Sequence, residues 1–183
     1  MGEKINSVDK TSVAVSKLDG LAEGVKLSGY YEVRCFDKDG NLKWEDTIKN
    51  LVTNVGGANL LDNHLSGSTY TAAWYLGLVD GGSAPTYALA DTAASHAGWT
   101  ENTNYTAGSR PAVSFNAASG KSKSSNEVVF TMNATGTIAG AFLISNNTKS
   151  GTTGVLFSCG NFSGGNRAVV NTDELRIVYT ATA

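Results

Sequence analysis

Charged side chains are scarce in this sequence, and their scarcity limits what the protein can bind. Lys, Arg, Asp and Glu supply 16% of the 183 residues, and the formal net charge is -2. Globular proteins average about 25% charged residues. A chain with so weak a field and no Lys/Arg cluster is not expected to bind nucleic acid by neutralising phosphates. Small neutral residues, among them 21 Gly, replace the missing charge and are typical of turns, sheet faces and subunit contacts.

Cysteine and long apolar runs are also scarce. Cys35 and Cys159 stand alone, each inside an apolar strand-like run. This context predicts two small buried hydrophobic side chains more readily than a disulfide or a metal site. No run approaches the ~20 apolar residues of a membrane span, and residues 1–6 carry no apolar signal segment. We therefore expect synthesis in the cytoplasm and no membrane partner.

The first 27 residues differ in composition from the rest. They contain no aromatic residue and carry single aliphatic residues at intervals, namely Ile5, Val8, Val13, Val15, Leu18, Leu21, Val25 and Leu27. We interpret residues 1–27 as an N-terminal arm, extended or weakly helical, that needs a partner surface to become ordered. A tail without a role is the alternative. Residues 28–183 are long enough for one domain with its own core.

Alternating side chains predict a β-hairpin at the start of this domain. In the first strand Tyr31, Val33 and Cys35 share one face. Residues 41–48 alternate again and form the second strand, although Asp46 interrupts their apolar face. The sequence Asp-Lys-Asp-Gly between the two strands predicts a turn, because Asp side chains bond to nearby backbone amides and Gly adopts positive φ.

One helix is expected after the hairpin. Asn50 is a suitable N-cap, and apolar residues recur at near-helical spacing through residues 51–65. The glycine pair at 56–57 interrupts this pattern and favours a break in the helix. His64 lies near the end of the segment, where an imidazole complements the last carbonyl groups.

Further strands are predicted from short apolar or alternating runs separated by Gly, Asn, Ser and Thr. They are residues 73–79, 112–117, 127–133, 137–145, 154–162 and 174–180. About eight short strands with one dominant helix predict a mainly β fold, an antiparallel β-sandwich of jelly-roll or Greek-key-like type. A parallel α/β fold is not expected because strands and helices do not alternate.

The longest irregular stretch runs from residue 80 to residue 110, and a loop of this length is commonly functional. The candidate interface residues in this loop and in the arm are Trp99, Tyr105, His96, Arg110, Tyr87, Val13, Val15 and Leu18. Trp99 is expected to face a partner. Arg110 can stack on an aromatic ring or pair with Asp91 or Glu101, and such contacts would fix the loop on the sheet.

Residues capable of chemistry are few and lack a recognisable arrangement. Only two histidines occur, and His96 joins Asp91 and a nearby serine only on paper, because no nucleophile-elbow sequence surrounds it. Asp91 and Glu101 flank Trp99, a pattern compatible with paired carboxylates for glycoside hydrolysis. That reading is the weakest hypothesis. No glycine pair has the sequence of a phosphate-binding loop. We predict no catalytic residue, no cofactor and no metal site.

A set of motifs in residues 28–182 adds a further line of inference. The motifs are Lys43-Trp44-Glu45, Asn50-Leu51-Val52-Thr53-Asn54, Leu60-Leu61-Asp62, Trp74-Tyr75-Leu76-Gly77-Leu78, Asp91-Thr92, His96-Ala97-Gly98-Trp99-Thr100-Glu101, Arg110-Pro111 and Gly140-Ala141-Phe142-Leu143-Ile144. In combination they resemble a family of structural proteins of tailed bacteriophages and prophages, small virion proteins encoded among head and tail genes.

The resemblance implies a non-enzymatic particle component, made in the host cytoplasm and incorporated into the virion. We expect a capsid decoration or cement protein, homo-oligomeric and specifically trimeric, bound to the major capsid protein, with no nucleic-acid or membrane partner. Low charge, an arm and a sheet-rich body with a large loop agree with this reading. The alternative is a tail or tail-fibre component whose loop around Trp99 and Tyr105 binds host-surface glycans. A virion hydrolase using Asp91, His96 and Glu101 comes third.

Overall fold

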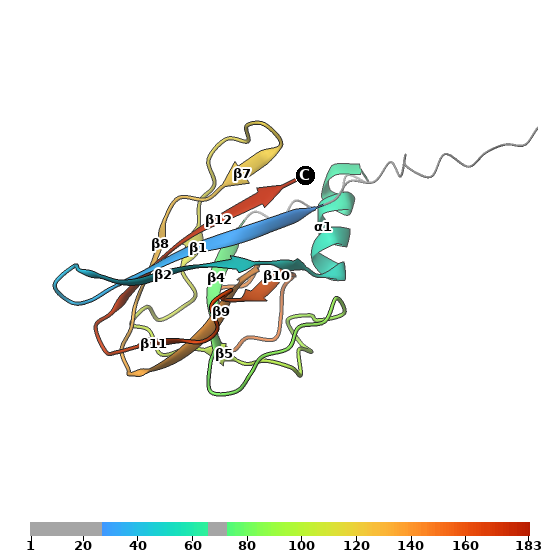
Figure 1. Cartoon of the computed structure of the whole chain (residues 1–183). Helices are drawn as coiled ribbons and strands as arrows, with labels where there is room; N and C mark the ends of the chain where they lie inside the picture. The colour runs from blue at the N-terminus through green and yellow to red at the C-terminus, as the bar shows by residue number, and fades with distance from the viewer. Residues whose placement is uncertain (1–26, 66–72) are drawn as a thin grey trace, which may run out of the picture.

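Two β-sheets packed face to face make up the body of the protein (Figure 1). The structure is a computed structural model that describes residues 27–65 and 73–183. Within these residues one helix, α1 (Asn54–Leu65), stands at one end of the sandwich. No helix in the described part of the chain is long and apolar enough to cross a membrane. The predicted antiparallel β-sandwich with one main helix is confirmed, whereas the predicted arm lies outside the described residues except for Leu27.

Sheet A is built around β1 (Ser28–Phe36) and β12 (Glu174–Thr182), which pair antiparallel along their whole length. The strand order is β2 (Leu42–Lys49), β1, β12, and both β7 (Ser122–Ser124) and β8 (Val128–Thr131) pair with β12. The first and last strands of the domain therefore lie side by side. Because β12 receives a partner on each side, it forms the centre of this sheet.

Sheet B has β9 (Gly136–Ile144) and β10 (Leu156–Asn161) at its centre. Outside them lie β3 (Leu51–Val52) on β10 and β4 (Trp74–Asp80) on β9. Three short strands complete the sheet: β5 (Glu101–Asn102) and β6 (Ala112–Val113) pair with β4, and β11 (Arg167–Val169) pairs with the start of β9. The predicted strands at 73–79, 137–145 and 154–162 correspond to β4, β9 and β10.

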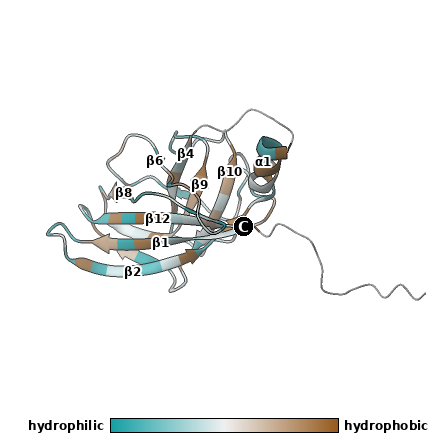
Figure 2. Ribbon diagram, turned by 90° about the horizontal axis from the view of Figure 1, so that it is seen from above, coloured by the Kyte–Doolittle hydropathy of each residue, from teal (hydrophilic) through white to brown (hydrophobic). Residues whose placement is uncertain are grey.

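Burial differs between the two sheets. Hydrophilic and hydrophobic residues alternate along β1 and β12 (Figure 2). Tyr31, Val33 and Cys35 share one face of β1, as predicted, and this face is fully buried against sheet B. In β9 every residue from 138 to 144 is buried. A strand that is apolar throughout needs cover on both faces. Sheet A covers one face of sheet B, and the segment 81–110 covers the other.

A bulge in β9 determines which of its side chains face sheet A and which face the 81–110 segment. The register with β4 shifts between Val79 and Asp80, which leaves Ala139 as an extra residue. Beyond the bulge Ala141 and Leu143 point into the core between the sheets, while Phe142 and Ile144 point to the outer face.

The β1–β2 turn has the structure that its residues predict. The carboxylate Oδ1 of Asp37 accepts hydrogen bonds of 2.9 Å from the amides of Asp39 and Asn41. Gly40 has a φ of 82°, a conformation that glycine adopts at little cost. Together these features end β1 and start β2 at the positions that keep their apolar faces aligned.

Asp46, which interrupts the apolar pattern of β2, closes one side of the sandwich. Its carboxylate accepts hydrogen bonds from Ser163 Oγ at 2.6 Å and from Arg167 Nε at 2.9 Å. Burial acts to raise the pKa of Asp46, but hydrogen bonds from Ser163 and Arg167 outweigh it and lower the pKa overall. Beside it Ile48 and Phe162 form a β-bridge. The outer edge of sheet A is thereby joined to sheet B.

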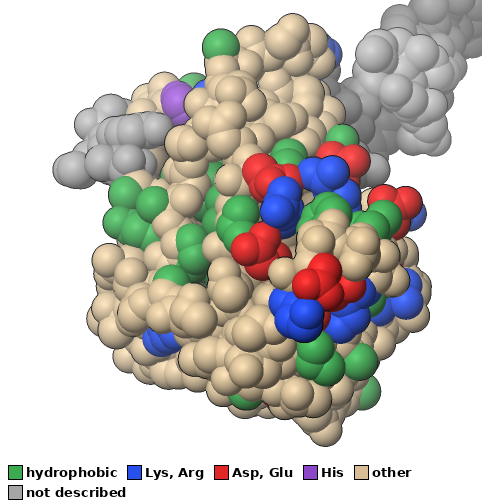
Figure 3. All heavy atoms as spheres, turned by 90° about the vertical axis from the view of Figure 1, so that its left-hand side faces the viewer, with side chains coloured by type: hydrophobic (Ala, Val, Ile, Leu, Met, Phe, Trp, Pro, Cys, Tyr) green, Lys and Arg blue, Asp and Glu red, His purple; other side chains and the backbone are tan. Residues whose placement is uncertain are grey.

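Ion pairs are concentrated at the end of the molecule that carries the β1–β2 turn, where acidic and basic side chains interleave (Figure 3). The pairs are Arg34–Glu127, Arg176–Glu127, Arg176–Glu174, Lys38–Asp39, Lys43–Asp173 and Arg167–Asp46. Pairs whose two side chains are both exposed, such as Lys38–Asp39, contribute about 0–1 kcal/mol each. In the Lys43–Asp173 and Arg167–Asp46 pairs the carboxylate is buried. Within all these pairs the positive and negative side chains balance one another.

The helix begins later than predicted and continues through both glycines. Thr53, not Asn50, is the N-cap, because its hydroxyl accepts a hydrogen bond from the amide of Gly56 at 3.1 Å. Residues 51–52, predicted as the first helical turn, form β3 instead. Gly56 packs against β10, where an added Cβ would lie 2.4 Å from the carbonyl oxygen of Phe157. The glycine therefore permits a close helix–strand approach and does not break the helix.

The strands that the sequence does not predict, which are β3, β5, β7 and β11, are all short. β5, β7 and β11 contain only two or three residues each, too few to show an alternation. The predicted strand at 112–117 is paired only at 112–113, as β6. Such pieces are defined by the neighbouring strand that offers them hydrogen bonds.

Gly56→Ala is expected to lower the free energy of unfolding by roughly 1–3 kcal/mol, because the new methyl group must push α1 away from Phe157. Gly57→Ala is the matched control, since nothing lies within 4 Å of its Cβ position. Replacing a helical glycine by alanine there is expected to stabilise by about 0.5–1 kcal/mol. Urea denaturation of the two variants measures the difference, and equal effects would contradict the close packing at Gly56.

Candidate functional site on the outer face of sheet B

Residues 81–110 fold over the outer face of sheet B (green to yellow-green in Figure 1). The buried apolar side chains between this segment and the sheet form a second core, made of Val79, Ala93, Trp99, Ala139, Phe142, Ile144, Leu156 and Cys159. Hydrogen bonds hold the segment at both margins. Tyr87 Oη donates to Asn161 Oδ1 at 2.6 Å, and the amide of Asn54 donates to Leu89 O at 2.8 Å. The loop is a packed part of the fold.

Three aromatic rings, those of Phe142, Trp99 and His96, pack one on another from sheet B into the loop and form a ring column. Gly77 in β4 leaves room for Phe142, because an added Cβ would lie 2.1 Å from the ring atom Cζ. Trp99 packs on Phe142 with ring centroids 5.1 Å apart, and His96 stacks on Trp99 at 4.1 Å with 25° between the planes. Each ring covers the one below it, so Trp99 is only 5% exposed.

Asp91 fixes the orientation of the tryptophan. Its Oδ2 accepts hydrogen bonds from Trp99 Nε1 at 3.0 Å and from the amide of Ala88 at 3.1 Å. The Nδ1 atom of His96 lies 3.1 Å from the carbonyl oxygen of Trp99, so Nδ1 carries the proton and donates. Asp91 is buried, and these two donors compensate the loss of water around its charge. Asp91 therefore connects Ala88 and Trp99 and holds this part of the loop in its folded conformation.

Glu101 and Arg110 form a buried ion pair at the other side of the loop. Arg110 Nε donates to Glu101 Oε1 at 2.9 Å and Nη2 donates to Oε2 at 2.8 Å, a bidentate geometry. Their side chains are 5% and 3% exposed. Arg110 Nη1 also donates to Asn146 O at 2.9 Å, and Glu101 Oε2 accepts from the amide of Ser150 at 2.6 Å. The pair ties the loop to the β9–β10 connection and confirms the prediction that Arg110 pairs with Asp91 or Glu101.

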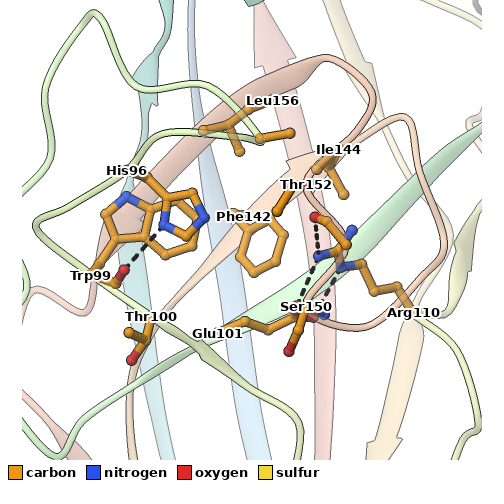
Figure 4. Close-up of a pocket in the computed structure, with 12 residues that line it drawn as sticks. His96, Trp99, Thr100, Glu101, Arg110, Phe142, Ile144, Ser150, Thr152 and Leu156 are labelled. Atoms are coloured by element: carbon orange, nitrogen blue, oxygen red, sulfur yellow. Dashed lines mark hydrogen bonds and ion pairs between the residues drawn. The ribbon is translucent and has the colours of Figure 1, made fainter.

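Between the ring column and the ion pair lies a pocket of about 280 Å³ (Figure 4). His96 and Trp99 lie on one side, Glu101 and Arg110 on the other, and Phe142 lies between them. The volume is at the lower limit of pockets that hold small ligands, roughly 300–1,000 Å³. Because Glu101 and Arg110 already neutralise each other, the pocket presents a ligand with no unpaired charge from this pair.

In the structure, the candidate catalytic groups Asp91 and Glu101 take part in contacts that stabilise the fold. Glycoside hydrolysis needs one carboxyl group that donates a proton and a second that attacks or activates water. Here Asp91 is a buried acceptor for Trp99, and Glu101 is held by Arg110. Among residues 27–65 and 73–183, no group of three or more His, Cys, Asp or Glu side chains is placed to hold a metal ion.

The two cysteines are buried free thiols, as predicted. Burial, followed by the charge of Asp173, raises the pKa of Cys35 to about 12. Burial, followed by the charge of Asp91, raises the pKa of Cys159 to about 12. Neither thiol forms a thiolate near neutral pH, so neither is an activated nucleophile.

The candidate interface residues fall into three groups. Trp99, Tyr105 and Arg110 are 5%, 1% and 3% exposed, which corrects the expectation that Trp99 offers its ring to a partner. Its ring is needed to cover Phe142. His96 and Tyr87 are half-buried, and His96 lines the pocket. Val13, Val15 and Leu18 lie outside the described residues.

Sequence reasoning does not place Gly77, Phe142 or Ser150 at this site. A glycine inside an apolar strand signals the close approach of another group, so Gly77 carries a usable signal. Phe142 looks like any core residue until both faces of β9 are known to be covered. Ser150 contributes its backbone amide at a φ of 55°, which its side-chain type does not reveal.

The sequence matches no protein-family model, and no curated protein is significantly similar to it. The assignment of a function therefore rests on the residues and on their geometry.

Arg110→Met is expected to lower the free energy of unfolding by about 3–5 kcal/mol, because Glu101 is left buried without its cation. The double variant Arg110→Met/Glu101→Leu is expected to recover part of this loss, since no buried charge remains. Guanidinium titrations of the two proteins make the comparison. Equal losses in both would show that something other than the stranded carboxylate causes the effect.

Neither thiol is expected to react with Ellman's reagent in the folded protein at about pH 8, because a thiol with a pKa near 12 holds almost no thiolate. Both are expected to react after unfolding in guanidinium, where the pKa returns to about 8.5. Absorbance of the released thiolate follows the reaction. A thiol that reacts at the unfolded rate in the native protein would contradict the burial of that cysteine.

Proposed function

We propose that the protein is a non-enzymatic component of a tailed-phage particle, a capsid decoration protein that binds the assembled shell. The observation that supports this reading most is how the chemically capable side chains are used. Asp91 and His96 bond to Trp99 within the loop, and the Glu101–Arg110 pair ties the loop to the β9–β10 connection. A fold that commits its few reactive groups to packing is suited to binding by surface shape. The motif resemblance to phage virion proteins is the reason for proposing a tailed-phage particle.

The shell-facing surface in this proposal is the end of the sandwich with the β1–β2 turn. Leu42 is 52% exposed and Val170 is 44% exposed. The Lys43–Asp173 ion pair joins the two segments that carry them, and Asp173 accepts a 2.9 Å hydrogen bond from the amide of Val170. Hydrophobic side chains lie among charged ones on this face (Figure 3). Apolar groups within a polar rim are typical of protein interfaces.

Binding of this kind stabilises a shell by mass action. A ligand that binds the assembled lattice and not the separate subunits shifts the equilibrium towards assembly. One copy of so small an end offers limited area, whereas specific interfaces bury about 1,200–2,000 Å² in total. A trimer presents three such ends at once and gains from their high effective concentration. The N-terminal arm adds contact area to neighbouring shell subunits at the cost of ordering it.

The protein is expected to co-sediment with expanded capsids of its phage and to raise the temperature at which they disassemble. Leu42→Asp/Val170→Asp is expected to weaken this binding about tenfold or more, since about 1.4 kcal/mol of lost apolar contact has that effect. Deleting residues 1–17 is expected to weaken it further. Quantitative sedimentation against a capsid titration measures the dissociation constants.

Leu89→Asp is the matched control, because Leu89 is 54% exposed but lies on the 81–110 loop. It is expected to bind capsids as the unaltered protein does. Binding to tails or to cell-surface polysaccharide, with none to capsids, would overturn the proposal in favour of a tail component.

A further inference from the structure

An apolar groove of about 300 Å³ lies between α1 and the adjoining ends of the two sheets. Its lining includes Leu60 of α1, Trp74 of β4, Phe157 of β10 and Ala181 of β12. Phe115 also lines it, so the groove is apolar on several sides. It is separate from the pocket beside Trp99 and from the end of the molecule proposed to face the shell.

The N-terminal segment enters the fold at the margin of this groove. Ser28 pairs with Thr182 and Gly29 pairs with Ala181 at the start of β1. Gly29 also lies against Tyr179, a groove residue, since an added Cβ would lie 2.9 Å from the Tyr179 hydroxyl oxygen. Leu27 packs on the main core just before it. Residues 1–26, which lie outside the described residues, therefore join the fold beside the groove.

Residues 18–25 have the composition to fill it. Leu18, Leu21 and Val25 follow the spacing i, i+3, i+7, which places side chains on one face of a helical segment. Asp19 and Glu23 follow the spacing i, i+4 on another face. The segment thus offers three aliphatic side chains and two negative charges.

The charge of the groove is complementary to that of the segment. Its described lining contains Lys123 and His64 and no acidic side chain. Lys123 is exposed, and its ammonium group donates one hydrogen bond to Asn116 O at 3.0 Å, which leaves further N–H donors for an acidic partner at the rim. On α1, next to the groove residues, Leu61 and Leu65 are 51% and 79% exposed, which extends the uncovered apolar surface along the helix.

We propose that residues 18–25 dock into this groove of their own chain, with Leu18, Leu21 and Val25 on its apolar lining and Asp19 and Glu23 towards Lys123. The same-chain arrangement follows from reach. Val25 is two residues from the anchored Leu27, a span of about 7 Å at most, so it cannot enter the groove of another copy that is not already in contact. A tether this short also gives a millimolar effective concentration.

Docking divides the arm into two parts. In this proposal residues 18–25 occupy the groove beside α1, and the distal part, residues 1–17, has its own aliphatic side chains for another surface. Docking takes place in the free protein and is independent of the proposed shell binding, so a failure of either leaves the other standing.

Hydrogen–deuterium exchange of the full-length protein tests the docking. Amides of residues 18–26 are expected to exchange about tenfold or more slowly than unprotected amides, while those of residues 2–13 exchange at the unprotected rate. The triple variant Leu18→Ser/Leu21→Ser/Val25→Ser is expected to remove the protection. The control triple variant Ile5→Ser/Val8→Ser/Val13→Ser is expected to keep it.

A charge reversal on the groove side makes the test reciprocal. Lys123→Glu is expected to lower the protection of residues 18–26 about threefold, and high salt is expected to do the same, because the attraction is partly exposed. Lys121→Glu makes the same charge change at an exposed residue that does not line the groove, and it is expected to have no effect.

Two results would overturn the proposal. One is exchange of residues 18–26 at the unprotected rate in the unaltered protein, which would leave the groove to another occupant. The other is loss of protection on dilution from about 100 µM to about 1 µM, which would identify the occupant as the arm of a second copy, since tethered docking does not depend on concentration.

Discussion

The structure depends on one constraint: sheet B carries apolar side chains on both faces and must be covered twice. Sheet A supplies the first cover through the alternating faces of β1 and β12. The second cover comes from the 81–110 segment, whose Trp99 seals Phe142 against water. The Glu101–Arg110 pair and the Asp91–Trp99 hydrogen bond hold that segment in place. Burying this outer face is worth roughly 25 cal/mol for each Å² of apolar area removed from water, which offsets the entropy of ordering a long loop.

Much of the fold follows from the sequence because its long strands are patterned. Tyr31, Val33 and Cys35 alternate with polar neighbours, and their burial against a sheet is a direct consequence of the two-residue period. The helix start does not follow, because a plausible cap at Asn50 competes with a better one at Thr53. Pairing with β10 decides where the helix starts, because residues 51–52 form a strand against β10 and cannot be helical. The glycine pair misleads for a similar reason, since its meaning depends on Phe157, far away in the chain.

The site could be predicted only in part. The sequence limits the partner of Arg110 to two nearby carboxylates, Asp91 and Glu101, because only their charge can be read from it. It does not show which of the two pairs with Arg110. The burial of Trp99 could not be predicted, because an aromatic residue in a polar loop looks the same whether it faces a partner or a second face of its own sheet. That second face becomes visible only when the bulge at Ala139 turns Phe142 and Ile144 outward. Tertiary context then decides what local composition leaves open.

The contacts that Asp46 makes at the outer side of β2 affect how a second chain could associate with this strand. β2 is an outer strand of sheet A, and an outer strand with free amides and carbonyls is a template on which a like chain can add. Here a charged residue in mid-strand, its Arg167 partner and the Ile48–Phe162 bridge occupy that side. That side of β2 therefore offers another chain fewer free backbone groups on which to add a strand. The strand whose apolar pattern Asp46 interrupts is thus also the strand whose outer side is partly occupied by residues of its own chain.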